Sequence, residues 1–116
     1  MKMNINFRKK RIFISVPITG FEDTYKDRLT EAKDKLIDIF DIDYDLVEII
    51  TPMDIDYIDE DNEALCIGQC ISELLTCDTL VSLSGWEKSR GCRTERFVAD
   101  TYGLNLLTFD DDKINS

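Results

Sequence analysis

A single segment, residues 77–95, constrains the fold of this 116-residue chain most strongly. Its first half, residues 79–83, is a short apolar run with β-branched side chains, which is typical of a strand buried on both faces of a parallel sheet. A turn follows at residues 84–86, and Ser89 is a good N-cap for a helix expected to run to the stop signal at Gly103. In open α/β sheets, ligands bind beyond the carboxyl ends of such strands, where helix N-termini present unpaired N–H groups.

The remainder of the chain alternates apolar runs of strand length with segments of helical periodicity. Strands are expected at residues 11–16, 46–50, 79–83 and 104–109, and helices at about residues 23–40, 63–77 and 89–103. This alternation predicts an α/β fold, Rossmann-like or flavodoxin-like, in which a four- to five-stranded parallel sheet lies between two layers of helices. The expected strand order is 2-1-3-4, which brings the ends of the first and third strands together at the switch point.

The helical periodicity also indicates which side chains face the sheet. The expected inward residues are Leu29, Ala32, Leu36, Ile39 and Phe40 in the first helix and Ala64, Ile67, Ile71, Leu74 and Leu75 in the second, with Cys70 at the edge of that second stripe. Residues 1–116 are expected to form one domain, because the chain is long enough for one core and too short for two. Residues 1–10 and 110–116 are expected to be flexible ends.

The composition limits the kinds of partner. The chain has 24 acidic and 14 basic residues and a net charge of −10, which argues against a nucleic acid polymer as ligand. A mononucleotide needs only a local phosphate site and is still allowed. Because the sequence contains no histidine, His-based catalytic triads and imidazole metal ligands are excluded.

The cysteines and the acidic loop give no reason to expect a metal or a cofactor. None of the cysteines forms a Cys-x-x-Cys pair, and reduced thiols in a cytoplasmic protein are expected for Cys66, Cys70, Cys77 and Cys92. The acidic loop at residues 53–62 lacks the glycine of a calcium loop and is expected to be solvated. A secretory signal and a run long enough to span a bilayer are both missing from the sequence, so no membrane association is expected.

Glu95 is the residue of the third helix that most invites a functional interpretation. At about 100° per residue it shares a face with Gly91, Cys92, Val98, Ala99 and Tyr102, while Arg90, Arg93 and Asp100 project the other way. Burying a carboxylate costs several kcal/mol unless something compensates. Two interpretations follow: an acid that lies beyond the edge of the sheet and touches water, or a functional acid held in an apolar site.

Two segments of the chain resemble a known family. Residues 12–20 and, more specifically, residues 77–95 are similar to the nucleoside 2-deoxyribosyltransferase-like superfamily. The resemblance covers nearly the whole chain and is closest to the small bacterial and phage branch of unknown function, which is similar to 2′-deoxynucleoside 5′-phosphate N-hydrolases. It implies an enzyme that breaks or transfers the N-glycosidic bond of a nucleoside or nucleoside monophosphate. It also implies that no cofactor is used and that the chain forms a homodimer or larger symmetric oligomer.

The resemblance assigns roles to individual residues of the second segment. Glu95 matches the nucleophile that attacks the anomeric carbon and forms a covalent glycosyl-enzyme intermediate. Ser89 matches a position that is serine in members acting on 5′-monophosphates and aspartate in members acting on free nucleosides, since an aspartate would repel a phosphate. Ser89, with the backbone of Arg90 and Gly91, therefore indicates a nucleotide, and Ser89 is equally suited to cap its helix.

Several positions of the implied substrate site depart from the family pattern. Phe13 stands where relatives often carry a tyrosine whose hydroxyl contacts the nucleophile, and Val16 replaces a glycine that gives the ligand room. Cys70 stands where relatives have an aspartate that aids base recognition and departure, and a thiol is a poor substitute for it. The implied substrate-binding residues are Phe13, Pro17, Cys70, Trp86, Ser89, Arg90 and Gly91. The departures leave an alternative open: a catalytically impaired module that binds or senses a nucleotide in the same cleft.

Two aromatic residues have more than one interpretation. Trp86 either covers the base of a bound nucleotide or anchors its turn against the protein. Phe97 is apolar on the polar side of its helix, so it is either a contact between copies of the chain or packs on the adjoining helix. A third functional hypothesis is a protein that acts through its acidic surface on a basic partner.

Overall fold

The computed structural model of the chain describes residues 10–39 and 47–111. Its strands are β1 (Lys10–Ser15), β2 (Val47–Ile50), β3 (Thr79–Leu83) and β4 (Asn105–Phe109), and its helices are α1 (Tyr25–Ile39), α2 (Glu63–Leu74) and α3 (Arg90–Thr101). Two short 3-10 helices that the sequence patterns did not predict, η1 (Pro52–Asp54) and η2 (Trp86–Lys88), precede α2 and α3. The expectations for residues 1–9, Phe40, Leu46 and residues 112–116 lie outside the described residues.

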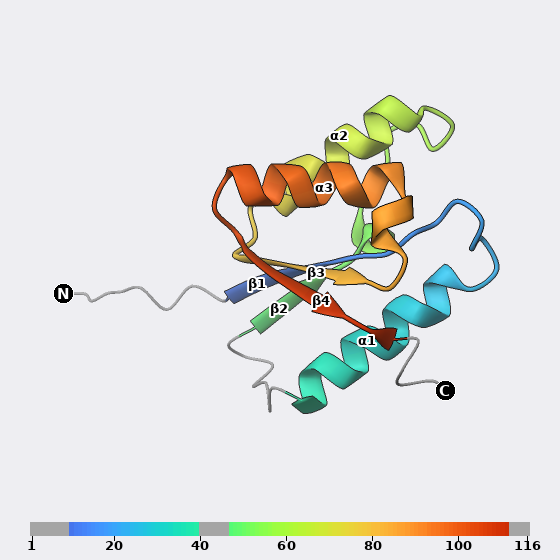
Figure 1. Cartoon of the computed structure of the whole chain (residues 1–116). Helices are drawn as coiled ribbons and strands as arrows, with labels where there is room; N and C mark the ends of the chain where they lie inside the picture. Colours follow the sequence, from blue (N-terminus) through green and yellow to red (C-terminus); the bar gives the residue numbers. More distant parts are fainter. Residues whose placement is uncertain (1–9, 40–46, 112–116) are drawn as a thin grey trace.

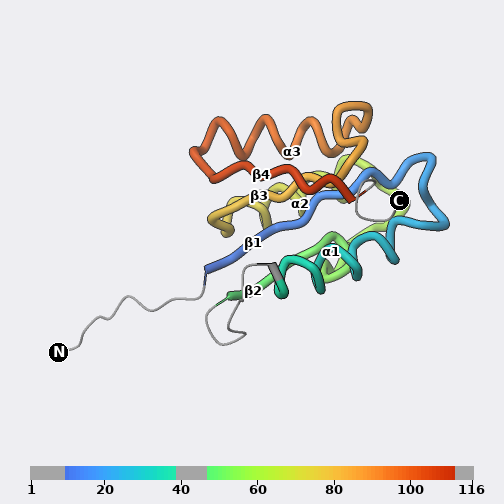
Figure 2. Tube along the Cα trace, turned by 60° about the horizontal axis from the view of Figure 1, so that its bottom comes forward, coloured from blue at the N-terminus to red at the C-terminus, as the bar shows by residue number. Residues whose placement is uncertain are grey.

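The four strands form one parallel sheet in the order β2-β1-β3-β4, which confirms the expected topology. Phe13 of β1 is opposite Ile50 of β2 and Leu80 of β3, and at the end of β1 Ser15 is opposite Ser82. Figure 1 shows α2 and α3 over one face of the sheet and α1 under the other, and in Figure 2 the traces of β4, β3, β1 and β2 follow one another in the order of the sheet. The fold is therefore a Rossmann-like α/β/α sandwich whose switch point lies between the carboxyl ends of β1 and β3.

Each face of the sheet carries its own core. The core on the α1 side consists of Ile12, Ile14, Val16, Leu29, Ala32, Leu36, Val81 and Leu83. The core on the α2 and α3 side consists of Phe13, Ile50, Cys70, Leu74, Cys77, Leu80 and Ala99. Successive residues of β1 alternate between these two cores, as the two-residue period of a strand requires. Because both faces of β1 and β3 are covered by helices, both strands are nearly continuous apolar runs.

The inward face of α2 differs from the expected stripe at two positions. Ala64 and Leu75, both expected to face the sheet, are exposed, Leu75 to 38%. The buried residues of α2 are Cys70 and Leu74, one turn apart, so Cys70 lies within the stripe and not at its edge. At about 100° per residue Ala64 points roughly at a right angle to that pair, so it lies on the side of the helix and not on its inward face. Leu75 follows the last helical residue as the C-cap, because α2 ends three residues earlier than expected.

The inward face of α3 is largely as expected. Cys92, Glu95 and Ala99 are buried, and the residues expected to project outward are exposed. Tyr102, expected on the buried face, is 68% exposed because it is the C-cap that follows the last helical residue. Phe97 is 72% exposed, so the interpretation in which it packs on the adjoining helix is wrong.

Candidate active site

The carboxyl group of Glu95 is buried against the end of β1. Its side chain comes from the inward face of α3, and the residue is 7% exposed. The hydroxyl of Ser15, a fully buried residue, donates a hydrogen bond of 2.7 Å to Oε1 of Glu95. This bond joins two residues 80 positions apart, because the switch point brings the end of β1 under α3. The interpretation in which Glu95 lies beyond the edge of the sheet in water is therefore wrong.

The surroundings of Glu95 change its acidity. Burial raises the pKa of Glu95 from its usual 4.5 to about 7, against the opposing effect of the hydrogen bond from Ser15. Burial also raises the pKa of the neighbouring Cys92 thiol. Glu95 is therefore divided between its neutral and ionised forms near neutral pH, which is the range in which a carboxyl group is most useful for acid–base or nucleophilic chemistry.

Glu95 lines a cavity of about 160 Å³ at the carboxyl ends of the strands. The walls come from the loop after β1, the loop after β2, and the facing sides of α2 and α3. They are formed by Val16, Ile18, Thr19, Pro52, Tyr57, Glu63, Cys66, Ile67, Cys70, Ser89, Gly91, Cys92 and Glu95. The lining is mostly apolar with a few polar groups, which is the usual make-up of a small-molecule site.

A second cavity of about 190 Å³ adjoins the first at the N-terminus of α3. The two share Thr19, Glu63, Ser89 and Gly91, and the second adds Pro17, Phe21, Gly85, Lys88 and Arg90. The hydroxyl of Ser89 accepts a hydrogen bond of 3.2 Å from the backbone N–H of Cys92, so Ser89 caps α3 as expected. A Cβ at Gly91 would meet no atom within 4 Å, so the backbone there is open to a ligand. The partial positive charge at the helix N-terminus and the side chains of Lys88 and Arg90 favour an anion at this end of the cleft, whereas the Glu63 carboxylate, 3.5 Å from Arg90, opposes it.

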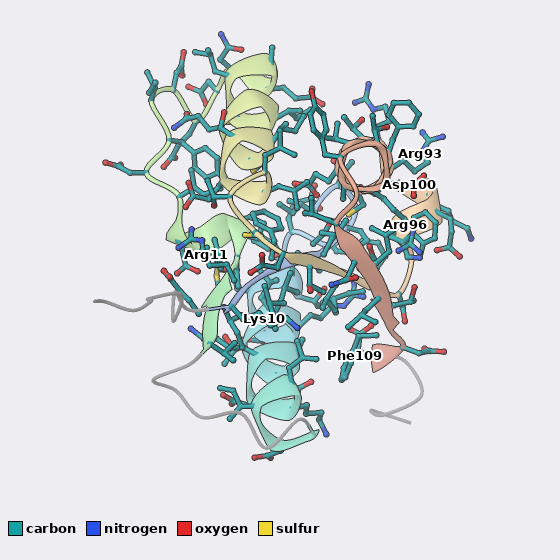
Figure 3. The ribbon with its side chains drawn as sticks, turned by 90° about the vertical axis from the view of Figure 1, so that its left-hand side faces the viewer. Lys10, Arg11, Arg93, Arg96, Asp100 and Phe109 are labelled. Carbon is teal, nitrogen blue, oxygen red and sulfur yellow. The ribbon has the colours of Figure 1, made fainter. Side chains whose placement is uncertain are left out.

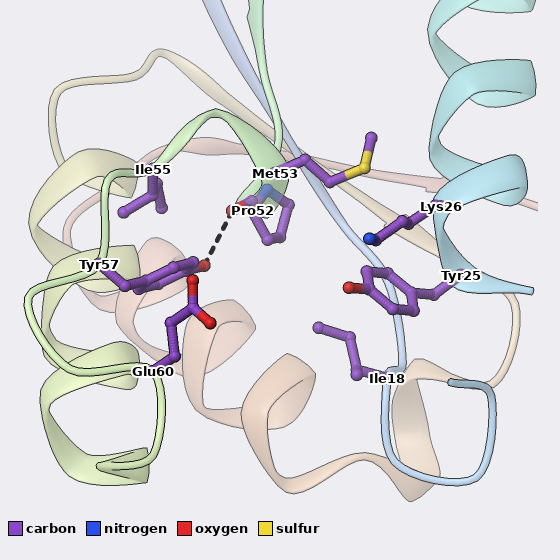
Figure 4. A pocket seen from close by; sticks show the side chains of 8 residues that line it. All are labelled: Ile18, Tyr25, Lys26, Pro52, Met53, Ile55, Tyr57 and Glu60. Atoms are coloured by element: carbon purple, nitrogen blue, oxygen red, sulfur yellow. Dashed lines mark hydrogen bonds between the residues drawn. The ribbon is translucent and has the colours of Figure 1, made fainter. Parts of the chain in front are cut away.

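A third cavity of about 290 Å³ adjoins the first on the opposite side. The two share Ile18, Pro52 and Tyr57. Figure 4 shows Tyr25 and Lys26 of α1 facing Tyr57 and Glu60 across this third cavity. The three cavities form one cleft over the ends of β1, β2 and β3, with Glu95 in its middle section and the anion-suited end at α3.

A tyrosine and a thiol lie together beside Glu95. The Tyr57 hydroxyl donates a hydrogen bond of 2.9 Å to the carbonyl oxygen of Pro52 and lies 3.3 Å from Sγ of Cys70. Because the hydroxyl has one proton, the thiol of Cys70 is the donor in the second contact. Burial raises the pKa of Cys70 to about 11 and is also the main cause of a raised pKa at Tyr57, and the charge of Glu95 adds to both shifts. Both groups are therefore neutral at physiological pH.

Two of the candidate residues do not reach the cleft. Phe13 is fully buried in the core and lines none of the three cavities. Trp86 lies on the outer side of α3, where the guanidinium carbon of Arg96 is 4.3 Å from the centre of its ring. The interpretation of Trp86 as an anchor of its turn therefore agrees with its position, and a bound molecule in the cleft would not contact it. The other candidates, Pro17, Cys70, Ser89, Arg90, Gly91 and Glu95, all line the cleft.

A family model described as a domain of unknown function (DUF4406) matches residues 10–108, which is most of the chain. The chain belongs to the DUF4406 family. The match contains every residue that lines the cleft. A search of curated proteins finds no match to this chain.

Two functional candidates of this DUF4406 chain were missed by the sequence analysis. Ser15 ends a buried strand at the switch point, and a hydroxyl at that position is the signal that would have found it. Tyr57 lies in the acidic loop after β2, and its aromatic ring within a charged segment was the available signal. Neither signal identifies the residue that Ser15 or Tyr57 contacts, because that contact depends on which helix crosses above the strand.

Neither a cluster of possible metal ligands nor a membrane-spanning helix is found in the described part of the chain. Between residues 10 and 39 and between 47 and 111, no three Cys, Asp or Glu side chains are grouped as metal ligands would be. None of the helices in these ranges is both long enough and apolar enough to cross a bilayer.

Proposed function

We propose that this DUF4406 chain cleaves or transfers the N-glycosidic bond of a nucleoside 5′-monophosphate or deoxynucleoside 5′-monophosphate, with Glu95 as the nucleophile. The observation that carries the proposal is the buried Glu95 carboxyl group, held by Ser15 in the middle of a cleft that ends at the N-terminus of α3. A family resemblance in residues 12–20 and 77–95 points to the same chemistry.

The three sections of the cleft match the three parts of a nucleotide. The phosphate would lie at the N-terminus of α3, beside Ser89, Lys88 and Arg90. The sugar would lie over Glu95, and the base would extend toward the cavity between Tyr25 and Tyr57. Flat apolar and aromatic walls suit a heteroaromatic ring.

The proposed reaction has two steps. The ionised Glu95 carboxylate attacks the anomeric carbon, the C–N bond breaks, and its electron pair leaves with the base, which takes up a proton. Water or a second acceptor then attacks the sugar ester, releases the sugar and regenerates the carboxylate. Ser15 orients the carboxyl group and lowers its pKa, which keeps more of it ionised.

One observation favours a second candidate, a nucleotide-binding module without catalysis. The neutral thiol of Cys70 lies on the cavity wall, where the resemblance implies a carboxyl group that assists base departure. Losing a proton donor for the leaving group commonly costs a factor of about 10² to 10⁴ in rate. Tyr57 also lines the cavity, but the proton of its hydroxyl is engaged by the carbonyl of Pro52.

Base release distinguishes the two candidates. The chain is incubated with a panel of nucleoside and deoxynucleoside 5′-monophosphates, and free base is followed by chromatography for wild type and Glu95→Ala. Base release by wild type alone is the result expected of the enzyme. If neither protein releases base while a nucleotide still raises the melting temperature, the binding module is the correct candidate. If no nucleotide releases base or shifts the melting temperature, both candidates are wrong.

A further inference from the structure

An ion pair beside the end of β4 joins two side chains that the proposed mechanism does not use. Nε of Arg28, in α1, donates a hydrogen bond of 2.7 Å to Oδ2 of Asp111, and Nη2 of Arg28 donates one of 3.0 Å to Oδ1. The two side chains are only 14% and 7% exposed. Figure 1 shows β4, which ends shortly before Asp111, running to the side of α1. Neither residue lines the cleft, so the ion pair needs a separate explanation.

Arg28 also contacts two walls of the anion-suited cavity, the one of about 190 Å³ at the N-terminus of α3. Its Nη2 donates a hydrogen bond of 2.8 Å to the carbonyl oxygen of Ser84, the residue before Gly85. Its guanidinium carbon lies 5.4 Å from the centre of the Phe21 ring. Phe21 and Gly85 both line the anion-suited cavity. One guanidinium group therefore connects the loop after β1 and the turn after β3 to the end of the sheet.

Asp111 holds the same turn from a second direction. Its Oδ1 accepts a hydrogen bond of 3.1 Å from the backbone N–H of Ser84, so the N–H and the carbonyl of Ser84 both bond to the ion pair. Burial alone would raise the pKa of Asp111, but the hydrogen bonds from Arg28 and Ser84 hold it below its ordinary value. Asp111 is therefore ionised at neutral pH.

The turn that the ion pair holds leads directly into the N-terminus of α3. Gly85 has a φ of +88°, a left-handed conformation that glycine adopts without strain. The backbone N–H of Lys88 bonds to the carbonyl of Gly85 at 3.1 Å, and that of Ser89 bonds to the carbonyl of Trp86 at 3.1 Å. Because Ser89 is the N-cap of α3, the position of this turn determines where the helix begins beside the anion-suited cavity.

A buried ion pair of this kind fixes a geometry more than it adds stability. The desolvation of two buried charges offsets much of their attraction, so the net gain in stability is small. The planar guanidinium group of Arg28, bonded to two carboxylate oxygens and one carbonyl oxygen, is instead held in one orientation. Because the two opposite charges nearly cancel at a distance, the intact pair by itself adds little attraction for a phosphate.

We propose that Arg28 and Asp111 are positioning residues that hold the Phe21 and Gly85 walls of the anion-suited cavity and so determine how tightly this end of the cleft binds a phosphate group. The part of this inference that concerns affinity rests on the proposed function, in which the anion-suited cavity holds the 5′-phosphate. Binding of a nucleoside without a phosphate is expected not to depend on the ion pair.

Asp111→Asn separates positioning from simple electrostatics, because the two effects predict opposite changes. The variant keeps the shape of the side chain and removes one negative charge near the anion-suited cavity. Electrostatics alone would tighten the binding of a phosphate, whereas the loss of the held walls is expected to weaken it at least about tenfold. Arg28→Lys keeps the positive charge but cannot bond to all three oxygens in the same directions, and it is expected to weaken the binding in the same way.

Binding is measured by calorimetry for the monophosphate of the panel that binds wild type most tightly and for the same nucleoside without its phosphate. All chains carry Glu95→Gln, so that no base is released during the titration. Glu48→Gln is the matched control, because it also removes one negative charge from an ion pair with an arginine, here Arg11. Figure 3 shows Arg11 beside β2 and apart from Phe109 at the end of β4. Both affinities are expected to be unchanged in Glu48→Gln.

Amide hydrogen exchange of the chain without any ligand tests the positioning directly. In Asp111→Asn and Arg28→Lys, the amides of Lys88 and Ser89 are expected to exchange at least about tenfold faster than in wild type, because the turn before them is no longer held. In Glu48→Gln the same amides are expected to exchange as in wild type. Circular dichroism checks that each variant is folded.

Three results would each overturn the proposal: tighter binding of the monophosphate by Asp111→Asn, an equal loss of affinity for the monophosphate and the nucleoside, or unchanged exchange at Lys88 and Ser89. A wild-type chain that binds neither the monophosphates nor the nucleosides would contradict the proposed function. In that case the exchange of the two amides alone decides whether the ion pair holds the turn.

Discussion

At the scale of single residues, the raised pKa of Glu95 is expected to make the free energy of unfolding depend on pH. The pKa of Glu95 is raised by burial to about 7 in the folded chain, whereas an exposed glutamate in the unfolded chain titrates near 4.5. Between these values the folded chain binds more protons than the unfolded chain, so the free energy of unfolding falls as the pH rises. The ionisation of Glu95 alone is expected to lower the free energy of unfolding by about 3 kcal/mol, and this decrease is expected to be complete by about pH 8.

Glu95→Gln tests this linkage without a substrate. The variant keeps the shape and hydrogen-bonding ability of the side chain but has no charge to bury. Relative to wild type, it is expected to be more stable at pH 8 by about 2 to 3 kcal/mol and similar in stability at pH 5. Urea unfolding of both proteins at several pH values measures the difference. A difference that does not change with pH would show that Glu95 keeps an ordinary pKa.

Ser15 is expected to set the acidity of Glu95. Its hydrogen bond favours the ionised carboxylate, so Ser15→Ala is expected to raise the pKa of Glu95 further. Carbon NMR of labelled glutamate carboxyl groups follows the titration directly. Ser82→Ala is the matched control, because Ser82 is the equally buried partner of Ser15 on β3 but bonds to Arg96. An unchanged Glu95 titration in Ser15→Ala would contradict the role given to Ser15.

The sequence identified some of these residues and not others. Helical periodicity placed Glu95 on the buried face of α3 together with Cys92 and Ala99. It did not identify Ser15 as the partner, because that contact depends on strand order and on how far α3 extends over β1. It did not identify Tyr57, because no periodic pattern exists in the loop that holds it.

At the scale of elements, the N-terminus of α3 combines a structural role with a proposed binding role. Ser89 caps the helix and lines both the Glu95 cavity and the anion-suited cavity. Ser89→Asp separates the two roles, since aspartate caps a helix as well as serine does but repels a phosphate. The variant is expected to keep the wild-type melting temperature to within a few degrees.

The same variant is expected to lose the thermal shift given by nucleoside monophosphates and to retain any shift given by free nucleosides. Ser89→Ala is the matched comparison, because it removes the cap at a cost of about 1 kcal/mol without adding charge. The shift in melting temperature is measured for both variants with and without each ligand. If Ser89→Asp still responds to monophosphates as wild type does, the phosphate does not lie at this helix end.

Most of the helices and strands could be predicted from the sequence. Alternating strand and helix patterns predicted the four strands and three helices of residues 10–39 and 47–111 in their observed order. The predicted ends of the elements were less accurate. Helix α2 was expected to end at residue 77, but it ends at Leu74. The short helix η1 also went unpredicted, although Thr51 and Asp54 form a capping box there that the sequence contains.

At the scale of the whole molecule, the strand order determines where the cleft lies. The 2-1-3-4 order predicted a site between the ends of β1 and β3, and Glu95 lies there. The order alone did not predict the width of the cleft, which extends past β2 because Tyr57 and Pro52 continue its wall. The strand order also did not predict that Trp86 lies on the side of α3 that faces away from the cleft. The turn at Gly85 and the short helix η2 determine where the Trp86 side chain points.

The central claim is that Glu95 is the nucleophile, and the most direct test is the mass of the intact chain during the reaction. The chain is mixed with a deoxynucleoside 5′-monophosphate that gives base release, the reaction is quenched rapidly with acid, and the mass is measured. The proposed mechanism is expected to add the mass of the sugar phosphate less one water, and peptide mapping is expected to place the addition on Glu95. Glu95→Gln, treated in the same way, is expected to show no addition. Base release by wild type with no adduct at any quench time, or with an adduct on another residue, would contradict the assignment of Glu95 as nucleophile.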